Sequence, residues 1–195
     1  MLVFWKEKLV LFAVPKTGTT ALEGALGPVA DIAILNPPGL KHCSVRRYLR
    51  HLAPFVERHA TAPMERVAVM REPVDWLESW YRYRTRPALR GQANSTGGID
   101  FEAFVTAYLA PEPPAFAKVG SQARFLEGGV DRLFRHDRIA DLVRFLETRL
   151  NRAIELPSAN VSPRRDVRLS PRLEQRLREE RPADFALWQR LHEGR

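Results

Sequence analysis

Residues 9–20 constrain the fold more than any other stretch of the chain. Leu9 to Val14 is an apolar run with the length and composition of a buried strand, and it stops at Pro15, which cannot donate to a sheet ladder. After a short turn, residues 21–26 have the pattern of the first turns of a helix. A strand, a tight turn and a helix N-terminus bring backbone N–H groups and the positive end of a helix dipole to one small concavity. The stretch therefore predicts a phosphate-binding site.

The residues of this turn suit an anion. Gly18 allows the backbone to approach a ligand closely. Lys16 supplies a formal charge, and three hydroxyl donors accompany it: Thr17, Thr19 and Thr20. The alternative is an ordinary turn followed by a helix N-cap without a ligand.

The remainder of the chain predicts an α/β fold. Apolar runs at 29–35, 66–70 and 130–134 are typical of further strands. They alternate with segments that predict helices, at 45–58, 73–81, 101–109, 120–126, 138–150, 171–178 and 182–191. We expect a central, mainly parallel sheet flanked by helices, with ligands beyond the carboxyl ends of the strands. The 15–20 turn and Arg71 are both expected at that edge.

Composition narrows the class of protein. A chain of 195 residues predicts a single domain over 1–195. Its apolar runs are too short for a bilayer and its start has no signal-peptide pattern, so we expect a cytoplasmic protein without stable membrane insertion. The single cysteine, Cys43, excludes an internal disulfide and a cysteine-based zinc site. A net charge of +8 fits a polyanionic ligand, while the absence of a run of basic residues argues against a nucleic-acid partner.

The 15–20 turn is not a Walker A motif. That motif ends in Gly-Lys-Ser/Thr, whereas Lys16 precedes Gly18 here. The third expected strand ends in Arg71, where a metal-dependent NTPase would present an aspartate, so we expect no metal site. A nucleotide kinase or NTPase with a degenerate loop and a non-catalytic nucleotide-binding module remain the alternative functions.

Two motifs resemble those of the sulfotransferase family. The sequence from Pro15 to Thr20, after a strand, is similar to the family's 5′-phosphosulfate loop. Arg71, followed eight positions later by Ser79, resembles its 3′-phosphate motif. Residues 99–105 and 133–139 resemble, more weakly, the family's aromatic helix and its Tyr-Glu-Asp-Leu turn. The resemblance implies a P-loop-like sulfotransferase fold.

The resemblance implies transfer of a sulfuryl group from 3′-phosphoadenosine 5′-phosphosulfate (PAPS) to an acceptor hydroxyl or amine. The second product is 3′-phosphoadenosine 5′-phosphate (PAP), and the in-line transfer is independent of metal. Lys16 would stabilise the charge that develops on the leaving phosphate. The loop, with Thr17, Gly18, Thr19 and Thr20, would hold the 5′-phosphate.

The resemblance implies that Arg71 and Ser79 bind the 3′-phosphate. A pairing of Arg71 with Glu72 or Asp75, and a solvated Ser79, are the alternatives. The basic pair Arg164 and Arg165 could be the counterpart of the family's C-terminal basic loop, or a solvated loop.

Histidine is the side chain best suited to act as a general base on the acceptor at neutral pH. Of the five histidines, His42 and His136 lie near expected strand ends. Members of the family carry a histidine in a place similar to His42, which implies that His42 is the base; packing or helix capping is the alternative. The acceptor would be a small molecule or a carbohydrate. The residues specify neither its identity nor the oligomeric state, nor whether the long loop at 85–100 is a lid or a surface insertion.

Overall fold

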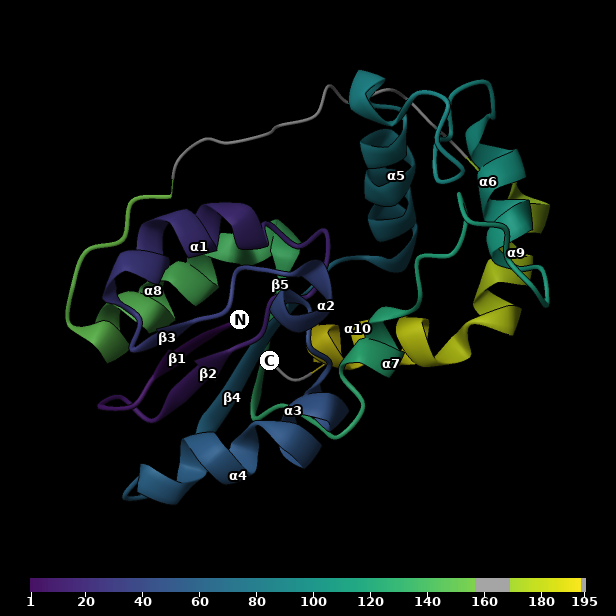
Figure 1. Cartoon of the computed structure of the whole chain (residues 1–195). Coiled ribbons are helices and arrows are strands. Elements are labelled where there is room, and N and C mark those ends of the chain that lie inside the picture. The colour runs from purple at the N-terminus through teal and green to yellow at the C-terminus, as the bar shows by residue number, and fades with distance from the viewer. Residues whose placement is uncertain (157–168, 194–195) are drawn as a thin grey trace. The chain divides into compact units, whose positions relative to one another are not determined.

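The computed structural model describes residues 1–156 and 169–193, without the side chains of His59, His192 and Glu193. The chain divides into two compact units. The sheet unit comprises Met1–Arg71 and Gln122–Asn160, and the helical unit comprises Glu72–Ser121 and Val161–Arg195 (Figure 1). A single functional domain over 1–195 stays a prediction. Within the described residues, no helix has the length and apolar character that crossing a membrane requires.

The sheet unit holds a five-stranded sheet with the order β3-β1-β2-β4-β5. The strands are β1 (Leu2–Phe4), β2 (Leu9–Leu11), β3 (Ile32–Ala33), β4 (Glu65–Met70) and β5 (Arg132–Arg135). Strands β2, β4 and β5 run parallel, with Val10 opposite Arg66 and Ala68 opposite Leu133. Strand β1 is antiparallel to both β2 and β3. The mixed α/β class is confirmed, with helices on both faces of the sheet.

The mainly parallel sheet of the prediction is correct only for the β2–β4–β5 half. The other half is antiparallel because β1, which no pattern in the sequence predicts, enters β2 through a turn at residues 5–8. A connection that short can join only antiparallel neighbours.

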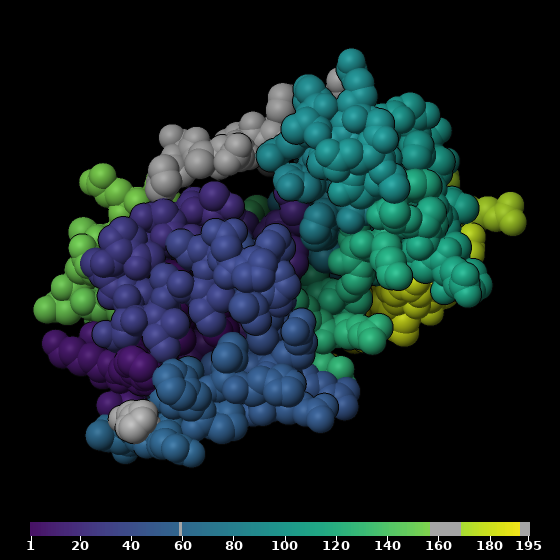
Figure 2. All heavy atoms as spheres, viewed as in Figure 1, coloured from purple at the N-terminus to yellow at the C-terminus, as the bar shows by residue number. Residues whose placement is uncertain are grey.

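Alternation along the strands sends side chains to two helical layers. On one face, Leu9, Leu11 and Val67 pack with side chains of α1 (Thr19–Leu26) and α8 (Ile139–Leu150). On the other face, the Phe12 ring meets Tyr48 of α3 (Val45–His51) edge to face at 5.3 Å, and the Trp5 Nε1–H donates to the Val56 carbonyl at the end of α4 (Ala53–Val56). Figure 1 shows both layers. Figure 2 shows the side chains of residues 20–56, purple to blue, forming a continuous surface of this unit on the face in view.

Two segments of the sheet unit differ from the sequence prediction. The strand expected at 29–35 shortens to β3, because Gly27–Val29 forms a 3-10 turn, η1. The helix expected at 45–58 breaks into α3, α4 and η2 (Glu57–His59). Pro54 has no N–H to continue the ladder of α3, so a new helix begins there. The remaining short elements of this unit are α2 (Pro38–Lys41), α7 (Gln122–Phe125) and η4 (His136–Arg138).

The helical unit packs α5 (Pro73–Arg84), α6 (Phe101–Tyr108), α9 (Pro171–Glu180) and α10 (Pro182–Glu193) around an aromatic core. Trp76, Phe104 and Leu177 are buried in it. The segment 85–100 contains η3 (Pro87–Leu89) and returns to the end of α5. There the buried Thr96 donates from its N–H to the Arg84 carbonyl and from its hydroxyl to the Tyr81 carbonyl. The segment is therefore tied to α5 at its second half, and its role as a lid stays a prediction.

Candidate anion site at the carboxyl ends of the parallel strands

The backbone of the 15–20 loop bends with alternating signs of φ. Lys16 has φ +67° and Gly18 has φ +81°, whereas Thr17 between them and Thr19 after them have no positive φ. A left-handed conformation costs a non-glycine residue such as Lys16 about 1–2 kcal/mol. Alternation of this kind turns successive N–H groups toward one concavity and is the geometry of backbone anion nests. The 15–20 loop therefore adopts, at a cost in conformational free energy, a backbone shape that fits an anion.

Several backbone N–H groups at this concavity have no acceptor among the described residues. Helix α1 has no side-chain cap at its N-terminus and no acidic residue in its first turn. The N–H groups of Ala21 and Leu22 donate to the Gly18 carbonyl. Those of Gly18, Thr19 and Thr20 find no acceptor in the part of the chain that the structure describes. Three open donors at a helix start are the arrangement that binds phosphate and sulfate groups.

The threonines of the loop divide into two kinds. Thr17 is fully buried, and its hydroxyl donates to the Val14 carbonyl at 2.8 Å. Thr17 therefore fixes the loop from inside, and the hydroxyl contact with a ligand that the sequence predicted is replaced by this internal bond. Thr19 is mostly buried and Thr20 is exposed at the start of α1. Their predicted contacts with a 5′-phosphate stay predictions.

Arg71 comes from the strand next to β2 and contacts the loop. Its Nη1 donates to the Lys16 carbonyl at 3.3 Å. The Arg71 backbone is held by Gln122 of α7: the Arg71 N–H donates to Gln122 Oε1 at 2.9 Å, and Gln122 Nε2 donates to the Arg71 carbonyl at 2.8 Å. Gln122 is itself only 1% exposed, so this reciprocal pair is rigid and shielded from water. The structure thus brings together Lys16 and Arg71, as the sequence predicted, and adds Gln122.

His42 follows α2 and is anchored to the strand that leads into the loop. Its Nδ1 donates to the Ala13 carbonyl at 2.7 Å; a carbonyl can only accept, so Nδ1 carries the proton and Nε2 has the lone pair of the neutral ring. Burial lowers the pKa of His42, which favours that neutral form. The neighbouring Lys41 is bound to the buried Glu23 of α1, with Lys41 Nζ 2.5 Å from Glu23 Oε2. These contacts hold in place a histidine that can accept a proton at Nε2.

A second histidine reaches the loop from β5. An added Cβ at Gly18 would lie 3.8 Å from His136 Nε2. The sequence placed His136 near a strand end but gave it no role, and the missing signal is the pairing of β5 with β4, which brings that strand end to the loop. Gln122 has no sequence signal, because its role depends on a partner 51 residues away.

The other predicted site residues lie in the helical unit or outside the described residues. Ser79 lies on α5 in the helical unit, where it is half-buried, and its contact with a 3′-phosphate stays a prediction. Arg164 and Arg165 lie outside the described residues. Within residues 1–156 and 169–193, no group of three or more His, Cys, Asp and Glu side chains could hold a metal ion.

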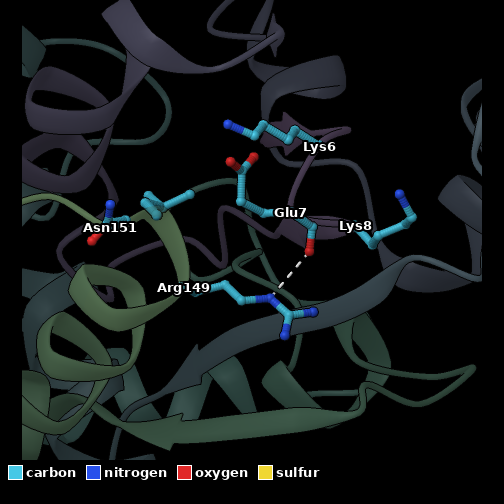
Figure 3. A pocket seen from close by; sticks show the side chains of 6 residues that line it. Lys6, Glu7, Lys8, Arg149 and Asn151 are labelled. Carbon is cyan, nitrogen blue, oxygen red and sulfur yellow. Dashed lines mark hydrogen bonds between the residues drawn. The ribbon is translucent and has the colours of Figure 1, made fainter.

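The sheet unit also has a hollow of about 690 Å³ at the amino end of β2 (Figure 3). Lys6, Glu7 and Lys8 of the β1–β2 turn line it together with the end of α8, where Arg149 and Asn151 lie. Arg149 donates from Nε to the Glu7 carbonyl at 3.1 Å and pairs through Nη2 with Glu65 Oε2 at 3.1 Å. Its guanidinium is therefore already bound to acceptors of the protein itself.

No family model, curated protein or solved structure matches this chain. The case for its function therefore depends on the residues and their geometry.

Proposed function

We propose that this protein is a sulfotransferase of P-loop-like fold that moves a sulfuryl group from PAPS to an acceptor hydroxyl or amine. The observation that carries the proposal is the set of open N–H groups at Gly18, Thr19 and Thr20, which follow the alternating φ signs of Lys16 and Gly18. The resemblance of residues 15–20 to a 5′-phosphosulfate loop makes phosphosulfate the anion of choice. Arg71 beside the loop supports a donor with more than one anionic group.

The transfer assigns a task to each group. An acceptor oxygen or nitrogen attacks sulfur while the bond from sulfur to the bridging oxygen breaks, and the bridging oxygen leaves with the electron pair on PAP. Lys16 and the loop N–H groups stabilise that oxygen, because its charge grows as the bond breaks. His42 takes the acceptor proton at Nε2, since Nδ1–H is engaged by Ala13. Arg71 keeps the loop in shape through the Lys16 carbonyl.

Thermal unfolding with added nucleotides tests the proposal. A ligand that binds the native state raises apparent stability, by about 2.7 kcal/mol when its concentration is a hundred times Kd. For a chain of this size, that corresponds to an increase in Tm of about 5–10 °C. We expect PAP to stabilise the protein more than ATP or 5′-AMP does. Stronger stabilisation by ATP would instead favour a nucleotide kinase or NTPase, and equal, negligible shifts with all three nucleotides would remove the proposal.

A further inference from the structure

His136 lies where the third parallel strand meets the loop. Strand β5 ends at Arg135, and His136 opens η4. The position that a Cβ would take on Gly18 is 3.8 Å from His136 Nε2 and 3.9 Å from Cδ2. The edge of the imidazole that carries Nε2 would therefore be in van der Waals contact with a side chain at position 18, and it lies beside the space that Gly18 leaves open. Gly18 is exposed and has one of the open N–H groups, and His136 is itself half-buried.

The neighbours of His136 in sequence bind each other. Arg135 Nε donates to Asp137 Oδ1 at 3.0 Å, and Arg135 Nη2 donates to Asp137 Oδ2 at 2.5 Å. This bidentate pair neutralises the two charges that flank His136. The imidazole of His136 is a polar group that this strand end places near Gly18.

The three parallel strands thus each bring one basic side chain to the same loop. Lys16 follows β2, and Arg71 follows β4 and donates to the Lys16 carbonyl. His136 follows β5 and lies beside the Cβ position of Gly18. Lys16 and Arg71 belong to the motifs that the sequence suggested, whereas His136 belongs to neither. An oxyanion bound to the N–H groups of Gly18 and Thr19 would have its oxygens about 3 Å from those nitrogens. His136 Nε2 lies beside the Cβ position of Gly18, one of the two residues whose N–H groups would hold that oxyanion.

We propose that His136 is a ligand-binding residue of this site and donates a hydrogen bond from Nε2 to the 5′-phosphate of the bound nucleotide. This inference rests on the proposed function for the identity of the nucleotide. Its physical basis is that a hydrogen bond to a charged group contributes more than one between neutral groups. The imidazole completes a cradle that otherwise consists of backbone donors and Lys16.

Binding of PAP by calorimetry to three variants tests the inference. His136→Ala removes the donor, and we expect its Kd for PAP to rise by about 10- to 100-fold, the worth of one charge-assisted hydrogen bond. His136→Gln keeps an N–H donor at a similar reach, and we expect its Kd to stay within about 3-fold of the wild type. His51→Gln is the matched control, because His51 is an exposed histidine of α3 in the same unit, and its Kd should not change.

An NMR measurement on the wild-type protein tests the inference even if a variant fails to fold. The ¹⁵N resonance of His136 Nε2, assigned by its loss in His136→Gln, should move when PAP is added and should not move with adenosine. Unchanged PAP affinity in a folded His136→Ala protein, or a static Nε2 resonance, would overturn the inference.

The same titrations separate this inference from the proposed function. If the wild type binds ATP more tightly than PAP, the sulfotransferase proposal fails; a loss of ATP affinity in His136→Ala would then still support His136 as the anion contact. If the wild type binds PAP and His136→Ala binds it equally well, the inference fails and the proposed function stands. If the wild type binds neither nucleotide, both are overturned.

Discussion

The two ends of strand β2 are both basic, yet they use their positive residues in opposite ways. Each end has a lysine in the left-handed region, Lys8 at φ +55° and Lys16 at φ +67°. At the amino end, the Lys8 N–H donates to the Trp5 carbonyl, and the Lys8 carbonyl accepts from the Glu65 N–H. The positive φ of Lys8 thus closes the hairpin and leaves its backbone satisfied within the sheet.

At the carboxyl end, the positive φ of Lys16 has a different consequence. It is followed by a second positive φ at Gly18, and the N–H groups at the start of α1 are left open. Arg71 braces this end by donating to a carbonyl of the loop, whereas Arg149 at the other end is bound to Glu7 and Glu65. The difference teaches that basic side chains around a hollow do not make an anion site. Backbone donors without internal acceptors are what distinguish the 15–20 loop.

The largest effect is expected from Gly18→Ala. Gly18 has φ +81°, which an alanine adopts only at a cost of about 1–2 kcal/mol. Relief of that strain would rotate the N–H groups away from their shared concavity. Because several charge-assisted hydrogen bonds are lost together, we expect PAP affinity to fall by about 100-fold or more, measured by calorimetry.

Gly129→Ala is the matched control for this change. Gly129 has φ +82° and no atom within 4 Å of an added Cβ, so the backbone strain is the same and no ligand contact is involved. Both variants should lose similar stability in thermal unfolding, and only Gly18→Ala should lose PAP. Retention of PAP binding by Gly18→Ala would mean that the nest geometry is not the binding element.

The next prediction compares Lys16 with Lys8, the two lysines whose backbone lies in the left-handed region. Lys16→Met should lower the rate at which PAP is released from PAPS by about 10²- to 10³-fold, the usual cost of removing one group that stabilises developing charge. The Kd for PAP should rise far less, because in the proposed reaction the lysine acts mainly on the transition state. Lys8→Met, at the other end of the same strand, should leave both quantities unchanged. An equal loss of rate and affinity in Lys16→Met would show that the lysine binds without catalysing.

The sequence could predict this loop because its determinants are local. An apolar run, a proline and a glycine-threonine turn specify β2, the bend and the start of α1 within residues 9–20. Strand β4 and Arg71, which follows it, were predictable for the same reason. The sequence does not predict strand β1, because the apolar run from Met1 to Trp5 has no alternation and is followed by charges.

The remaining features depend on contacts between distant parts of the chain. Gln122 binds the Arg71 backbone, and its sequence neighbours carry no hint of that partner. His136 is recognisable in the sequence as a histidine near a strand end, but its place beside Gly18 requires β5 to pair with β4. The internal hydrogen bond of the Thr17 hydroxyl could not be predicted either, because the sequence does not tell whether a loop threonine faces a ligand or the core.

The smallest expected effect concerns His42. Its removal tests whether the carboxyl end of β2 is catalytic or only basic. Burial lowers the pKa of His42 below its usual 6.5, so the neutral base persists to more acidic pH than for a free histidine. If His42 accepts the acceptor proton, kcat/KM should rise with pH through that lowered pKa and level off above it. His42→Gln should reduce the plateau by about 10²-fold at most and abolish the acidic limb.

The pH dependence of the free energy of unfolding tests the protonation of His42 independently. The folded state binds fewer protons at His42 than the unfolded state between the two pKa values, so the free energy of unfolding should rise with pH across that window and fall on acidification. His42→Gln should remove this dependence, and His51→Gln should retain both it and the kcat/KM profile. If His42→Gln flattens the stability curve but leaves the acidic limb of kcat/KM intact, His42 is a buried structural histidine and the base lies elsewhere. Loss of both together would place the proton acceptor at the loop end of β2, beside the open N–H groups.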